Sequence, residues 1–158
     1  MPAPRVRRVV TGHDTEGSSI VTIDEVAQGE RFTLIWSTDR SPADNTDTVD
    51  GGKRELGLAI EGGTVFRIGE LEPGVRSRMH RTNSVDYGIV LEGEIDMELD
   101  GGETVHLKTG DVVVQRRTNH LWANTSDHAC KMAWILIDAA PVQVGGRVLD
   151  PSPHVPGN

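Results

Sequence analysis

Two histidines and one aspartate stand at spacings that could bring their side chains into one site. His80 and Asp86 share a short segment, and His120 lies in a later strand-like run. Two imidazoles and a carboxylate leave open coordination positions on a metal, an arrangement associated with non-haem iron. We therefore expect His80, Asp86 and His120 to bind a divalent transition metal (Fe, Mn, Zn or Ni), with His80 and His120 as the catalytic residues.

Neighbours at even spacing should share the face of these histidines, because side chains two positions apart on a strand point the same way. Thr82 then lies with His80, and Trp122 and Asn124 lie with His120. An arginine two residues before His80 suits a carboxylate, phosphate or enolate. The expected substrate-binding residues are Arg78, Thr82, Gln115, Trp122 and Asn124.

Metal-free interpretations remain open for the same residues. His80 could be a pocket histidine hydrogen-bonded to Asp86, His120 could be structural, and Arg78 could be a solvated strand-end arginine. Thr82 offers only a neutral hydroxyl, which is a poor metal ligand beside an imidazole. A buried, ionised Asp86 needs either a metal or a protonated histidine, because burying an unpaired charge is costly.

The segment from Gly74 to Gly93 resembles the first cupin motif. That motif runs glycine, five residues, His-x-His, three or four residues, Glu, six residues, glycine. The segment reads Gly-Val-Arg-Ser-Arg-Met-His-Arg-Thr-Asn-Ser-Val-Asp-Tyr-Gly-Ile-Val-Leu-Glu-Gly. Every interval fits, with Thr82 in place of the second histidine and Asp86 in place of the glutamate.

The segment from Gly110 to Asn124 is similar to the second cupin motif, in which a histidine is followed after three residues by an asparagine. His120 and Asn124 keep that interval, whereas the Pro-x-Gly of the motif is absent and Arg116 and Arg117 precede the turn. The resemblance implies an all-β fold, a single cupin jelly-roll β-barrel with an N-terminal strand arm. It also implies a homodimer, as does the excess of N-terminal strands, which would otherwise expose pairing edges.

Short alternating runs separated by turns support this organisation. Residues 1–61 should hold N-terminal strands (5–10, 19–26 and 32–36) and a polar, mobile loop at 37–54, packed on the barrel or on a partner subunit. Residues 62–140 should form the barrel, and residues 141–158 an extended tail. The strands expected in the barrel are 64–71, 79–82, 86–91, 94–99, 103–107, 111–115, 120–124 and 129–137.

The composition of the 158 residues fits one globular domain, with 36% hydrophobic and 25% charged residues. The net charge of −8 argues against nucleic acids and anionic membranes as partners. The lone cysteine, Cys130, cannot form an intramolecular disulfide, and the N-terminus lacks the apolar segment of a secretory signal. A cytoplasmic protein is expected.

Three functions remain open from the sequence. The first is a metal-dependent enzyme acting on a small oxygenated or acidic metabolite, as an oxygenase, isomerase, lyase or decarboxylase. The second is a metal-free enzyme in which His80 or His120 performs acid–base catalysis with Asp86 as its orienting partner. The third is a module that binds or senses a small ligand without catalysis. The fold alone does not choose among them.

Overall fold

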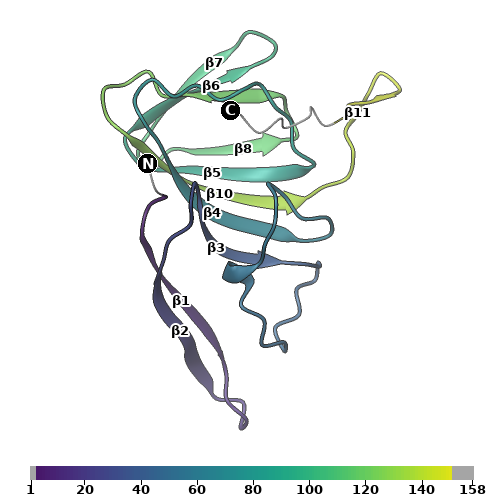
Figure 1. The fold of residues 1–158 in the computed structure, drawn as a ribbon. Helices are drawn as coiled ribbons and strands as arrows, with labels where there is room; N and C mark the ends of the chain where they lie inside the picture. Colours follow the sequence, from purple (N-terminus) through teal and green to yellow (C-terminus); the bar gives the residue numbers. More distant parts are fainter. Residues whose placement is uncertain (1–2, 151–158) are drawn as a thin grey trace.

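The computed structural model describes residues 3–150, which form antiparallel β-strands and, within that range, one 3-10 helix. The predicted all-β fold is confirmed. Two sheets lie face to face around a shared core, with strand orders β3-β4-β10-β5-β8 and β7-β6-β9 (Figure 1). The larger sheet contains β3 (Thr33–Thr38), β4 (Thr64–Leu71), β10 (Cys130–Asp138), β5 (Ser84–Glu92) and β8 (Val112–Arg116). The smaller contains β7 (Thr104–Lys108), β6 (Glu94–Leu99) and β9 (His120–Ala123).

Alternation of side chains builds the core from both sheets. In β5, Ser84, Asp86 and Val90 are buried, and in β6 the buried residues are Ile95 and Met97. Strands of this kind present every second side chain to one face. The main apolar cluster comprises Val90, Ile95, Met97, Leu107, Trp122, Cys130 and Met132. Because its members come from β5 to β7, β9 and β10, the cluster joins the two sheets into one body.

The predicted strand at 79–82 is wrong as a regular strand. The chain from Gly74 to His80 instead runs along β9 and makes two isolated bridges, Arg76 to Ala123 and His80 to His120. Between these bridges the segment has three residues (77–79) against two of β9 (121–122), which is the mismatch of a bulge. The extra residue interrupts the ladder of main-chain hydrogen bonds, yet His80 still pairs with His120.

A long hairpin projects away from the barrel (Figure 1). It consists of β1 (Val6–His13) and β2 (Ser19–Ala27), and we call these two strands the arm. Arg8 joins the arm to the body: its guanidinium binds Glu25 of the arm and Asp50 of the loop that follows β3. The side chain of Arg8 is only 2% exposed, so this ion-pair cluster is the buried part of the junction.

The polar segment predicted as a loop begins later than expected, because Ser37 and Thr38 still belong to β3. Asp50 then caps the 3-10 helix η1 (Gly51–Lys53) by accepting from the amide of Gly52. The predicted tail contains a small hairpin of β11 (Gln143–Val144) and β12 (Arg147–Val148), while its part at 151–158 lies outside the described residues. Within residues 3–150, no helix has the length and apolar character needed to cross a membrane.

Candidate functional site

His80 and His120 form a main-chain pair at the end of β9. The amide of each histidine donates to the carbonyl of the other, at 2.8 and 2.9 Å. Residues that exchange both hydrogen bonds in an antiparallel pair carry their side chains on the same side. The two imidazole rings accordingly lie 4.4 Å apart between centroids.

Backbone carbonyls fix the tautomer of both rings. Nδ1 of His80 lies 2.9 Å from the carbonyl oxygen of Arg78, and Nδ1 of His120 lies 3.0 Å from that of Thr118. A carbonyl only accepts, so the ring proton of each neutral imidazole resides on Nδ1 and Nε2 carries the lone pair. Burial also lowers the pKa of His120 to about 4, which keeps that ring neutral around pH 7.

Asp86 is held by two hydroxyl groups. The Ser84 hydroxyl donates to Oδ1 at 2.5 Å, and the Thr82 hydroxyl donates to Oδ2 at 3.2 Å. Asp86 itself is 6% exposed, and burial raises its pKa, against the opposing effect of both hydroxyls and of the nearby Arg67 and His80. Thr82 therefore contacts the predicted site, but as a donor to the carboxylate.

The other predicted site residues lie either beside His120 and Asp86 or away from them. Trp122 is buried with its ring 5.7 Å from that of His120, and Gln115 is the strand partner of Asp86. The side-chain amide of Asn124 donates to the carbonyls of Leu71 and His128, so it organises the chain after β9. Arg78 is exposed at the surface.

Gln115 already has partners for its side chain. Its amide nitrogen donates to the sulfur of Met97 at 2.7 Å, and its amide oxygen accepts from the hydroxyl of Thr118. Thr118 also supplies the carbonyl that binds His120. Gln115 therefore supports the histidine through Thr118.

Arg67 and Ser84 were missed by the sequence analysis. Arg67, on β4, is 9% exposed, donates to the carbonyl of Leu58 at 2.7 Å and lies 5.1 Å from the ring centroid of Phe32. Burial lowers its pKa to about 10. Its neighbours Phe66 and Ile68 are both apolar, so the sequence alone does not mark Arg67 as the buried residue. Ser84 could have been found from the even spacing of Thr82, Ser84 and Asp86, because such spacing places side chains on one face of a strand.

The three predicted metal ligands do not converge as they stand. Among residues 3–150, no three His, Cys, Asp or Glu side chains gather closely enough to hold a metal ion. The histidine pair offers two imidazole nitrogens of the right chemistry, whereas the carboxylate of Asp86 is turned to Ser84 and Thr82. The donor set therefore fits a metal through its two histidines, while the carboxylate of Asp86 is oriented by its hydroxyl donors.

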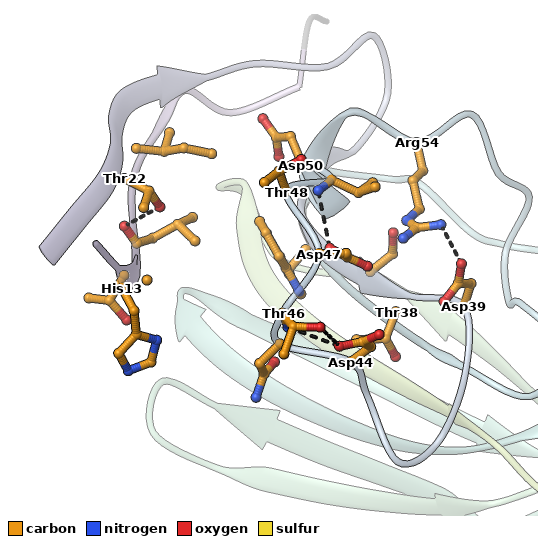
Figure 2. A pocket seen from close by; sticks show the side chains of 18 of the residues that line it. His13, Thr22, Thr38, Asp39, Asp44, Thr46, Asp47, Thr48, Asp50 and Arg54 are labelled. Carbon is orange, nitrogen blue, oxygen red and sulfur yellow. Dashed lines mark hydrogen bonds and ion pairs between the residues drawn. The ribbon is translucent and has the colours of Figure 1, made fainter. Parts of the chain in front are cut away.

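A separate cleft of about 830 Å³ opens between the arm and the loop after β3. Figure 2 shows His13 and Thr22 of the arm on one side and Asp44, Asp47 and other polar residues on the other. Neither histidine of the central pair lines this cleft. It is therefore distinct from the site built on β9.

Comparison with known proteins decides the family. A family model described as a cupin domain matches residues 67–136. A cupin-domain-containing oxidoreductase of Aspergillus ruber, fogC, is 35% identical over 160 residues, covering 92% of this chain and 79% of its own. The chain belongs to the cupin family. The cupin resemblance seen in the segments 74–93 and 110–124 is thus confirmed.

Two further likenesses accompany this assignment. The phomopsin biosynthesis cluster protein C' of Diaporthe leptostromiformis is 41% identical to this cupin over 157 residues, covering 90% of this chain and 83% of that protein. The crystal structure of a cupin 2 conserved barrel domain protein from Salinispora arenicola is 25% identical, with a TM-score of 0.44. That match covers 48% of this chain and 64% of the other.

Proposed function

We propose that this cupin is a metal-dependent oxidoreductase that acts on a small oxygenated or acidic metabolite inside the barrel. The observation that carries the proposal is the histidine pair: His80 and His120 lie side by side, and the neutral form of each ring has the tautomer that places the lone pair on Nε2. The names of several relatives favour oxidation over isomerisation, cleavage or decarboxylation, and others are named as biosynthesis cluster proteins.

Each residue of the site has a separate role in this proposal. A divalent transition metal (Fe, Mn, Zn or Ni) would supply Lewis acidity and open coordination positions. His80 and His120 would hold it, with Asp86 as the third ligand. The carbonyls of Arg78 and Thr118 orient the two imidazoles, and Trp122 forms the wall against His120. The chain thus contributes the orientation of both imidazoles and an apolar neighbour for His120.

Metal analysis tests this proposal. The protein is purified without chelator or nickel resin, offered each metal separately, dialysed, and measured for bound metal. The wild type should hold about one ion per chain, and His80→Ala and His120→Ala should each abolish it. His128→Ala is the matched control, because the imidazole of that histidine is exposed and its hydrogen bond is with the neighbouring Asp127, away from the histidine pair. A wild type that retains none of the four metals contradicts the proposal.

A metal-free function is the second candidate, and the hydroxyl contacts of Asp86 favour it. Ser84 and Thr82 satisfy the carboxylate without a cation. In that case the site would bind or sense a small ligand, or His80 or His120 would exchange a proton with it. Ligand binding that persists in protein without metal would support this candidate.

We further propose a cytoplasmic homodimer. The arm carries exposed apolar side chains on both strands, including Val9 (50% exposed), Val21 (57%) and Val26 (52%). Because β1 and β2 pair only with each other in the described structure, their outer edges are available to a second chain. The buried Cys130 requires no oxidising compartment.

A further inference from the structure

Arg117 lines a cavity at the end of the barrel. It directly follows β8 and is 5% exposed. The cavity has a volume of about 500 Å³, and its wall is formed where β4 and β5 begin and where β8 and β10 end. Its lining includes Arg117, Asn83, Glu61 and Asp138.

The guanidinium group of Arg117 has far fewer partners than its burial requires. It donates from Nη2 to the side-chain oxygen of Asn83, while Nε and Nη1 are buried and have no acceptor within residues 3–150. Arg8 shows how this chain otherwise treats a buried arginine, because Arg8 binds two carboxylates and a backbone carbonyl. A buried cation without an anionic partner is costly, so the unsatisfied Nε and Nη1 of Arg117 indicate that this side chain binds an anion.

The backbone at Arg117 adds an independent observation. Its φ of 59° lies in the left-handed region, and no other non-glycine residue from 3 to 150 has a positive φ. A residue with a Cβ atom pays roughly 1–2 kcal/mol for this conformation, which glycine adopts freely. Strain of this kind persists where the side chain has a task that glycine could not perform.

We propose that Arg117 forms a binding site for the carboxylate of a small molecule. This inference goes beyond the proposed function and adds a second ligand site. Glu61 and Asp138 also line the cavity, and Asp138 accepts a hydrogen bond from the amide of Gly62. These acidic groups disfavour a second negative charge, so the ligand is a monocarboxylate that carries hydroxyl or other donor groups on its remaining atoms.

Arg117 is linked to the histidine site through neighbouring residues of the chain. Its neighbour Thr118 supplies the carbonyl that orients His120. On the facing strand, Asn83 precedes Ser84, whose hydroxyl holds Asp86. A carboxylate at Arg117 therefore binds beside residues that position His120 and Asp86, while neither histidine lines the cavity itself.

Nuclear magnetic resonance of the arginine Nε–H groups tests the subsite in the full chain without added metal. Glycolate is the probe, with neutral glycolamide and inorganic phosphate in parallel titrations. The Nε–H resonance that disappears in Arg117→Gly identifies Arg117, and this resonance should shift saturably with glycolate but not with glycolamide. Glycine is suited to the left-handed backbone, so this variant should retain the fold.

Glycolate affinity should fall at least tenfold in Arg117→Gly and remain unchanged in Arg116→Gln, which alters the exposed neighbour. Unchanged affinity in Arg117→Gly, equal shifts with glycolamide, or saturation by phosphate alone would each overturn the assignment. Since neither metal nor turnover enters the measurement, its failure is distinguishable from failure of the metal-dependent function.

Discussion

The hydroxyl of Ser84 lies 2.5 Å from Oδ1 of Asp86, two residues farther along β5. Thr82, two residues earlier, contacts the other oxygen of the same carboxylate. The residue that replaces the second motif histidine is therefore engaged with the residue that replaces the motif glutamate. The two departures from the cupin pattern are physically coupled.

Thr82→His should tighten metal binding and slow the loss of metal to a chelator. The substitution supplies an imidazole next to the histidine pair and removes one hydroxyl that now holds Asp86. The measurement is metal content over time during competition with a chelator. Thr109→His, at an exposed turn, is the control. If neither wild type nor Thr82→His retains metal at neutral pH, the proposed ligands do not converge.

Arg8→Met should lower the free energy of unfolding by about 2 kcal/mol, because it leaves the carboxylates of Glu25 and Asp50 without their buried partner. Chemical denaturation measures the change. Arg7→Met is a matched control on the same strand, since the Arg7–Asp24 pair is exposed and should contribute at most about 1 kcal/mol. Equal effects of the two substitutions would show that the arm junction is not a buried ion-pair cluster.

His106 should make the stability depend on pH. Its hydrogen bond from the ring to Asp96 raises the pKa of His106 above the ordinary value of 6.5. A raised folded-state pKa gives stability that is fully present below the unfolded pKa and is lost as pH rises through the folded pKa.

The melting temperatures of wild type and His106→Asn, compared from mildly acidic to mildly alkaline pH, should therefore approach each other as pH rises. The difference should be small and should shrink with salt, because the pair is exposed. A constant difference across this range would contradict the assignment to His106.

Light scattering at micromolar concentration should give the mass of a dimer. Replacing the exposed arm valines Val9, Val21 and Val26 with lysine should shift the mass toward a monomer, because charges disfavour burial of this face. The same substitutions at Val112 and Val114, exposed on β8, provide a comparison surface. A monomer mass for the wild type with the arm present would exclude the proposed dimer.

Strands with clear alternation and explicit turns could be predicted from the sequence. The ranges of β4 and β6 agree with the expected 64–71 and 94–99, because each is bounded by turn residues. The segment around His80 could not be predicted as it is, since the alternation of its side chains resembles a strand while its pairing includes an extra residue. Local sequence does not reveal how many residues of one strand lie opposite a given stretch of its partner strand.

The candidate site could likewise be predicted only in part. The motif spacing identified His80 and His120 as candidate residues. The main-chain hydrogen bonds between these two residues place their rings side by side. Arg117 escaped notice for a different reason. Its importance depends on burial and on a left-handed backbone, and neither property is visible in a pair of adjacent arginines.

The pairing of the segment 74–80 with β9 also has a consequence for how this chain can vary. The segment is anchored at both ends: the amide of Gly74 donates to the carbonyl of Asn124, and His80 exchanges two bonds with His120. The number of residues between these anchors determines which way the imidazole of His80 points. The side chains of Arg76 and Arg78, by contrast, are exposed. Inserting or deleting one residue there would turn His80 out of the barrel, while many side-chain replacements would leave it in place.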